Sequence, residues 1–159
     1  MEPSLTFDPD VGLGGHKDLS LRFAGQALQC DIYFFAIDHG FRPDDGDLAK
    51  VVASLGRLFE QWLEALRTVK AGENAYLPYD FSDQYTGWLR CTRVDEGFDV
   101  VAGWCEVEGW RFSPTQIGQR LYHLDDFRTK GPTVRMSTAD LEAAILESAA
   151  KVAALDDHI

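Results

Sequence analysis

The most constraining feature of this sequence is a run of apolar residues, spaced three and four positions apart, from Leu48 to Lys70. This spacing puts them on one face of an α-helix of about six turns, with charged residues opposite. Acidic residues before the run suit a helix N-terminus, and Gly72 suits the end of the helix. Such a helix must bury its apolar face against another layer of structure. The face comprises Leu48, Val51, Val52, Leu55, Leu58, Phe59, Trp62, Leu66 and Val69.

A strand pattern precedes this helix. Apolar and polar residues alternate from Leu19, and the pattern continues through a turn at Gly25 and Gln26 to Ile37. The segment 1–18 is rich in proline and glycine, and we expect it to be irregular apart from a short strand at 5–7.

Two further strand patterns follow the helix. Thr86–Val94 and Phe98–Val107 alternate, and Gly97 between them suits the positive φ of a hairpin turn. Gly103, inside the second strand, indicates a bulge or the close approach of a large neighbouring ring. A short third strand is expected at Trp110–Phe112.

The last part of the chain reads mainly as two helices. Ser113 and Gln116 match a capping box with proline between them, which predicts a short helix over 114–122. A weak edge strand is expected at 133–136, and residues 137–140 open a C-terminal helix. The final residues, 156–159, are expected to fray.

These patterns predict a single α+β domain over residues 1–159. We expect an antiparallel sheet of about five strands, drawn from Leu19–Ile37 and Thr86–Phe112. The long helix and the C-terminal helix should pack on this sheet, with Trp88 and Trp104 in the core beneath the long helix.

The composition fits an ordinary globular domain. Hydrophobic residues make up 45% and charged residues 26% of the 159 residues, close to the average for such domains. No apolar run approaches the ~20 residues needed to span a bilayer. The first ten residues lack the basic region and apolar block of a signal peptide, so we expect a cytoplasmic protein.

The net charge of −11 limits the kinds of partner, and most of the excess acid lies in residues 1–47 and 73–112. Such a surface repels phosphate backbones and anionic lipid, which argues against binding nucleic acid or membranes. It would attract a basic protein. The alternative that stays open is that the acid serves only to keep the domain soluble.

The sequence contains no specific catalytic, cofactor or metal motif. The four histidines, at 16, 39, 123 and 158, lack the spacing of zinc ligands. Three cysteines fit reduced thiols better than a disulfide framework, although a bridge between Cys91 and Cys105 on neighbouring strands stays open. We therefore predict no metal, no cofactor and no enzymatic activity.

The segment 77–85 reads as an acidic loop interleaved with aromatic residues. Aromatic side chains dominate protein interfaces, and acids around them would steer a basic partner. The alternative is that this segment closes over the end of the long helix and its aromatics belong to the core. The candidate partner-binding residues are Tyr79, Asp80, Phe81, Asp83 and Tyr85.

The runs PYDFSDQYTGWLR and AGWCEVEGWRFSP resemble segments of small bacterial immunity proteins, the partners of secreted polymorphic toxins. The resemblance covers about 40 of the 159 residues and rests on an aspartate–aromatic loop, a hairpin and glycine–tryptophan pairs. It implies a non-enzymatic, stoichiometric binder that occludes a toxin's active site. Such families share no catalytic signature, so the resemblance assigns no functional residue.

The leading hypothesis is therefore an acidic protein-binding module of the immunity type. A second hypothesis is a small-molecule-binding or hydrolytic domain that uses a pocket between sheet and helix. Its polar groups would be Asp80, Asp83 and His123. A third is a structural or oligomerisation subunit, and the sequence does not indicate an oligomeric state.

Overall fold

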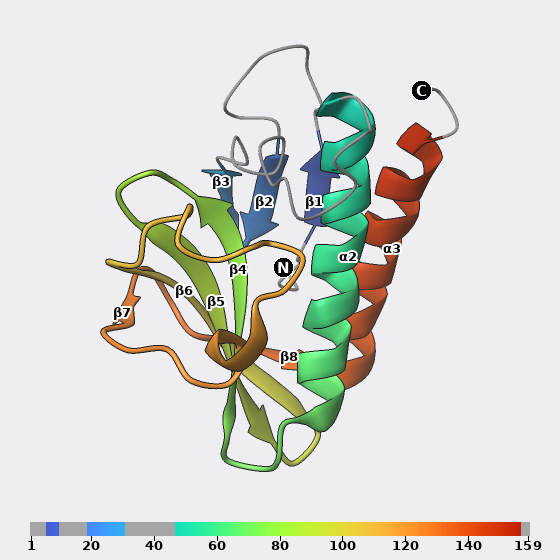
Figure 1. The fold of residues 1–159 in the computed structure, drawn as a ribbon. Coiled ribbons are helices and arrows are strands. Elements are labelled where there is room, and N and C mark those ends of the chain that lie inside the picture. The colour runs from blue at the N-terminus through green and yellow to red at the C-terminus, as the bar shows by residue number, and fades with distance from the viewer. Residues whose placement is uncertain (1–5, 10–18, 31–46, 157–159) are drawn as a thin grey trace.

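The computed structural model describes residues 6–9, 19–30 and 47–156 (Figure 1). Within this part of the chain the fold is α+β, as predicted, with two α-helices, a five-stranded antiparallel sheet and a second sheet of three strands. Several predicted features lie outside the described residues: strand 31–37, most of the segment 1–18, the acidic residues 44 and 45 before the long helix, and the tail 157–159.

Helix α2 (Asp47–Thr68) confirms the predicted long helix. The chain leaves it through a turn at Gly72, whose φ of +82° explains the glycine, and the Gly72 N–H donates to the Arg93 carbonyl at 2.9 Å. Lys50, expected on the polar face, is instead buried. The apolar face is buried as predicted at Val51, Val52, Leu55, Leu58, Phe59, Trp62, Leu66 and Val69.

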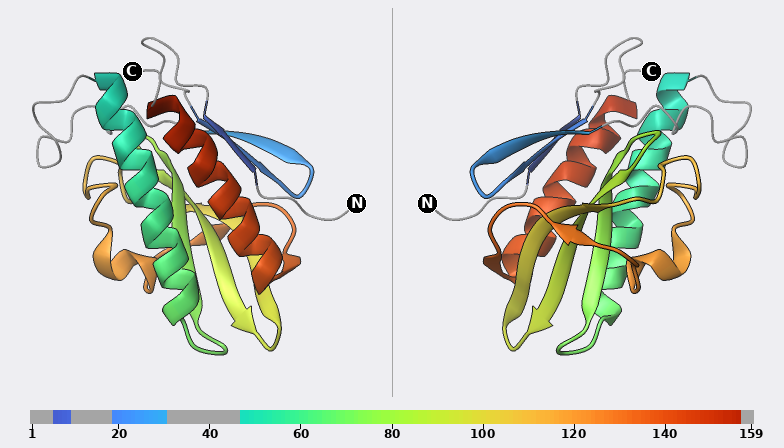
Figure 2. Two further views of the ribbon diagram at one scale, coloured as in Figure 1. Left: turned by 90° about the vertical axis from the view of Figure 1, so that its right-hand side faces the viewer. Right: turned by 90° about the vertical axis from the view of Figure 1, so that its left-hand side faces the viewer.

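The five-stranded sheet runs in the order β4, β5, β6, and both β7 and β8 pair with the far edge of β6. Helix α3 (Thr138–Asp156) follows β8, and Ser137 caps it by accepting the Asp140 N–H at 3.0 Å. In Figure 2, α2 and α3 lie side by side on one face of this sheet. The strands are β4 (Asn74–Phe81), β5 (Thr86–Val94), β6 (Gly97–Cys105), β7 (Arg128–Thr129) and β8 (Val134–Ser137).

The expectation of a loop over 77–85 is wrong, because residues 77–81 complete the edge strand β4. Proline argues against a central strand, but on an edge strand its missing N–H breaks no ladder hydrogen bond. Pro78 therefore fits here, and the register shifts between Pro78 and Asp80. Only 82–85 connect β4 to β5.

The first predicted strand block does not join the five-stranded sheet. The three strands β1 (Thr6–Pro9), β2 (Leu19–Phe23) and β3 (Gln26–Cys30) form a separate antiparallel sheet. Ala24 and Gly25, with φ of 53° and 78°, make the two-residue turn between β2 and β3. The larger sheet reaches five strands through β4, β7 and β8 instead.

Two expectations for the segment after β6 are also wrong. Trp110–Phe112 forms turns and bends instead of a strand, and the helix predicted over 114–122 is only a short 3-10 helix, η1 (Gly118–Leu121). The side chain of Gln61 on α2 explains the second difference. Its amide donates to the Pro114 carbonyl and accepts the Ile117 N–H, both at 2.8 Å, and so binds this backbone in a non-helical form.

Different parts of the chain pack on the two faces of the larger sheet. Arg93 donates from its side chain to the Leu66 carbonyl of α2 at 3.2 Å, so its face of β5, which it shares with Leu89, meets the helices. Trp88 lies on the opposite face, where Phe112 stacks on it at 5.5 Å. Trp88 is thus buried as expected, but not beneath the long helix.

The two cysteines of the larger sheet are free and buried. Cys105 lies opposite Thr86 and Cys91 lies opposite Val100, so the two thiols are not cross-strand neighbours. The proposed bridge between them is therefore absent.

Candidate functional site

A row of four residues crosses the larger sheet near one end. Asp80 on β4, Gly87 on β5, Trp104 on β6 and Arg128 on β7 are successive cross-strand partners. Residues directly opposite each other place their side chains on the same face of a sheet. Because Gly87 has no side chain, the row has a gap between Asp80 and Trp104, which the Tyr79 ring partly fills.

This gap opens into a groove of about 800 Å³. A Cβ atom on Gly87 would lie 3.0 Å from the Asp80 Cβ and 3.0 Å from the Tyr79 ring, so glycine at this position lets the Tyr79 ring pack closely against β5. Strand β3 of the smaller sheet contributes one wall. The lining residues are Ala27, Leu28, Tyr79, Asp80, Tyr85, Gly87, Gly103, Trp104 and Lys130.

Aromatic rings and one arginine define the character of the groove. Tyr85, 41% exposed, meets the Trp104 ring edge-on, with 6.4 Å between ring centroids. The Arg128 guanidinium lies over the same indole, 4.9 Å from its centroid, and its ion pair with Glu106 is long at 3.5 Å. The Trp104 ring therefore already accepts a cation in the free protein.

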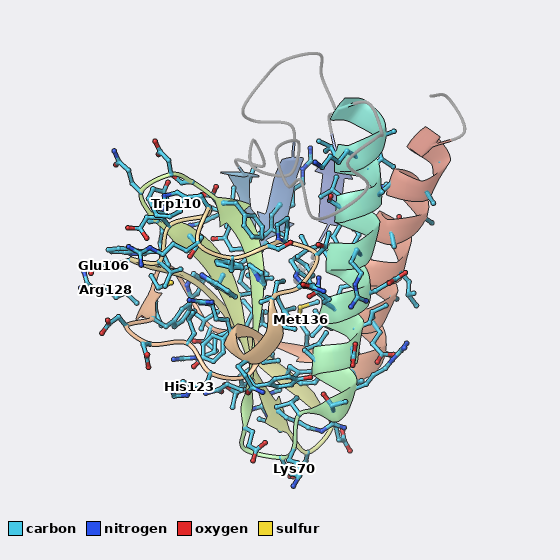
Figure 3. All side chains as sticks on the ribbon, in the orientation of Figure 1. Lys70, Glu106, Trp110, His123, Arg128 and Met136 are labelled. Atoms are coloured by element: carbon cyan, nitrogen blue, oxygen red, sulfur yellow. The ribbon has the colours of Figure 1, made fainter. Side chains whose placement is uncertain are left out.

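A turn beside the groove presents an exposed tryptophan. The Gly109 N–H donates to the Ser82 carbonyl at 2.6 Å, which fixes the turn against the β4–β5 connection. Arg111 covers the Trp110 ring at 5.1 Å and pairs with Glu108 at 2.6 Å. Trp110 is nevertheless 56% exposed. It lies on the same side of the molecule as Glu106 and Arg128, away from α2 and α3 (Figure 3). We call the groove and the turn 108–111 together the groove end.

The structure brings together three of the five predicted contact residues. Tyr79, Asp80 and Tyr85 all line the groove, but Tyr79 and Asp80 are buried, and Tyr79 belongs to the core as the alternative held. Phe81 is fully buried, and its ring packs on Phe112 at 5.6 Å. Asp83 is exposed in the β4–β5 connection and does not line the groove. The role of these residues in binding a partner stays a prediction.

Sequence reasoning missed the residues that complete the groove, namely Trp104, Lys130 and the neighbouring Arg128. Alternation along one strand assigns side chains to a face but does not say which residue of the next strand lies opposite. One signal was available at Gly103, which indicated either a bulge or the close approach of a large ring. A Cβ atom there would overlap the Phe127 ring, which supports the second alternative.

The pocket imagined for a hydrolytic domain does not assemble as predicted. Asp80 lines the groove, but neither Asp83 nor His123 does. His123 lies on the surface beside an exposed carboxylate, Asp125, at 3.1 Å. Burial raises the pKa of the Cys91 thiol, which keeps it protonated. Among the described residues, no group of three or more histidine, cysteine or acidic side chains is placed to hold a metal ion.

Some acidic side chains of the strand region form ion pairs with arginines of the fold. Arg135 donates two hydrogen bonds to Asp99, at 2.7 and 3.1 Å, and these bonds hold the pKa of that carboxyl below its usual value. Glu106 and Glu108 also pair with arginines. The excess negative charge of this region is therefore less concentrated at the groove end than the sequence alone indicates.

Comparison with known proteins finds no matching family model, no matching curated protein and no matching solved structure. The geometry of the groove end must therefore carry the functional argument. Neither of the described helices is long and apolar enough to cross a membrane.

Proposed function

We propose that this chain is a non-enzymatic protein-binding module and that the groove end is its contact surface. The observation that carries the proposal is the gathering of Tyr85, Trp104 and Trp110, with Arg111 and Arg128 stacked on the two indoles, at one end of the sheet. Tryptophan, tyrosine and arginine are the residues most enriched among those that dominate binding energy at protein interfaces.

The fixed geometry of this surface also favours binding. The backbone bond from Gly109 to Ser82 and the ion pair between Glu108 and Arg111 hold the turn that carries Trp110. Side chains that are already ordered lose less conformational entropy when a partner binds. An exposed ring on a fixed turn is therefore a suitable anchor for a complementary surface.

The immunity type of module is proposed from the charge and from the resemblance of 78–90 and 102–114 to immunity proteins. A net charge of −11 accelerates association with a basic protein, such as a toxin domain, and disfavours nucleic acid and anionic membranes. In this proposal the chain binds the toxin stoichiometrically and blocks its active site. The chain itself performs no reaction.

The test uses the protein encoded next to this chain's gene as the partner. Tyr85→Ala removes an aromatic ring from the groove, and Tyr122→Ala removes a tyrosine of similar exposure, 39% against 41%, from outside it. We expect Tyr85→Ala to weaken binding by about 10- to 30-fold and Tyr122→Ala by no more than about twofold. Isothermal titration calorimetry measures both.

Two outcomes count against the proposal. Absence of binding by the wild-type chain removes its support altogether. Equal losses of affinity in the two tyrosine variants would still support the partner, but they would show that the groove is not the contact surface. A cell-growth assay with the neighbouring protein then asks whether binding neutralises a toxic activity.

A small-molecule-binding function is the second candidate, and the groove volume favours it. About 800 Å³ lies in the range of roughly 300–1,000 Å³ that is usual for ligand sites. Of the three polar residues predicted for such a pocket, Asp80 is the one that lines the groove. An NMR screen of a fragment library that follows the indole N–H signal of Trp104 tests this small-molecule function. Binding of a protein partner without binding of any fragment would count against this function.

A further inference from the structure

We infer that the groove is an arginine-binding site, with Arg128 occupying the Trp104 ring in the free protein as a partner's arginine would occupy it in the complex. This inference deepens the proposed function by naming the group that the groove receives. It begins from the row Asp80, Gly87, Trp104 and Arg128, which places a carboxylate, an indole and a guanidinium on one face, with a glycine between the first two.

The groove has the surroundings that a cation requires. Tyr79, Tyr85 and Trp104 bound it with aromatic rings, and Asp80 contributes a carboxylate. Aromatic faces attract cations through the ring quadrupole, and carboxylates match guanidinium groups geometrically. A carboxylate offers about four acceptor positions, so Asp80 can accept a guest's N–H in addition to its contacts within the fold.

The Arg128 stack identifies guanidinium as the cation. Its guanidinium lies 4.9 Å from the Trp104 centroid, within the usual ~6 Å range for a cation over an aromatic ring. The pair between Arg128 and Glu106 is long at 3.5 Å, and both side chains are more than half exposed. A weak surface pair of this kind yields readily, so a partner's guanidinium can displace Arg128 from the ring.

Lys130 is the groove residue that opposes this assignment. It is exposed, and an exposed ammonium in water acts on a charge about 4 Å away with only roughly 1 kcal/mol. Lys130 therefore lowers the affinity for a cation without preventing binding. Lys130 also makes the sign of the bound group's charge testable, because removing this lysine must raise the affinity for a cation and lower the affinity for an anion.

The experiment titrates the isolated protein with N-acetyl-arginine amide and follows the indole N–H signal of Trp104 by NMR, assigned with Trp104→Phe. N-acetyl-citrulline amide is the neutral probe of the same shape, and N-acetyl-glutamate amide is the anionic probe. We expect a saturable shift with the arginine probe alone. A shift of equal size with the citrulline probe, or no shift with the arginine probe, would overturn the inference.

Four variants sharpen the titration. Arg128→Gln should bind the arginine probe about two- to fivefold more tightly, since the ring is vacated, and Lys130→Ala should also strengthen binding. Asp80→Asn should weaken it at least about tenfold. Arg120→Gln removes an arginine that lies over the Phe112 ring, outside the groove, and is the matched control, with no expected change.

The variants also separate the possible outcomes. Weaker arginine binding in Lys130→Ala, or a shift with the glutamate probe, would reverse the assigned charge and overturn the inference. The titration needs no partner protein. Failure of the neighbouring protein to bind while the arginine probe binds would overturn the proposed function and leave the arginine site standing.

Discussion

The helix-packed part of the sheet and the groove end use similar aromatic residues in opposite settings. Trp62 on α2 is fully buried and meets the Phe59 ring edge-on at 5.6 Å. Trp110 is 56% exposed, and the Arg111 guanidinium lies over its ring at 5.1 Å. The comparison teaches that one region supplies the stability of the fold, whereas the other holds apolar rings in water where a partner can reach them.

The largest expected effect on stability concerns the two tryptophans of this comparison. Trp62→Ala should lower the free energy of unfolding by about 3–5 kcal/mol, because it removes a fully buried indole from the core. Trp110→Ala should change it by no more than about 0.5 kcal/mol. Urea denaturation measures both, and a large loss in Trp110→Ala would contradict the division of roles.

Two glycines, one in each region, allow the same comparison of stability effects. A Cβ atom at Gly103, beside the groove, would overlap the Phe127 ring and the Arg128 carbonyl, so Gly103→Ala should cost about 1–3 kcal/mol. Gly56 on α2 has open space around its Cβ position, and Gly56→Ala should stabilise the protein by about 0.5–1 kcal/mol. Thermal melts compare the two, and effects of the same sign would contradict this account.

The Gln61 side chain joins α2 to the backbone of 114–117, which follows the turn 108–111 of the groove end. Gln61→Met keeps the shape but leaves a buried carbonyl and a buried N–H without their partners, at a cost of about 1–3 kcal/mol. Gln119→Met, at an exposed position of the same segment, is the control. Equal melting temperatures for the two variants would show that this connection is unimportant.

Sequence patterns predicted the elements that depend on local periodicity. The apolar stripe specified α2 because its spacing of three and four residues is the helical repeat itself, and β5 was predicted with its observed bounds. The edge strand β4 was missed because Pro78 argues for a loop unless its place at the sheet edge is known.

The site was less predictable because it depends on register between strands. Tyr79, Asp80 and Tyr85 stood out as an acidic and aromatic segment, but Trp104 and Arg128 join them only through pairing across β5, β6 and β7. That pairing is fixed by long-range packing, which a single sequence does not reveal. Phe81 was misassigned because the same pairing turns it toward Phe112.

The smallest expected effect concerns the ion pair of Asp99 and Arg135, at the end of the sheet away from the groove. Hydrogen bonds from Arg135 lower the pKa of Asp99 in the folded state, so the pair stabilises the fold above the unfolded pKa. This contribution is lost as pH falls through the folded pKa. Arg135→Met should therefore be slightly less stable than wild type at pH 7, and the difference should vanish in acid and shrink in high salt.

A difference between Arg135→Met and wild type that persists below pH 3 would contradict this assignment. Arg67→Met, which removes the exposed pair with Glu142 on the helix side, is a matched control for the loss of a surface arginine.

Hydrogen exchange of the chain with and without the protein encoded next to its gene tests the central claim most directly. If the groove end is the contact surface, binding should slow exchange at 82–87, 103–111 and 128–130 and leave the outer face of α3 unchanged. Protection confined to α3 or to the turn 94–97, with none at the groove end, would contradict the account.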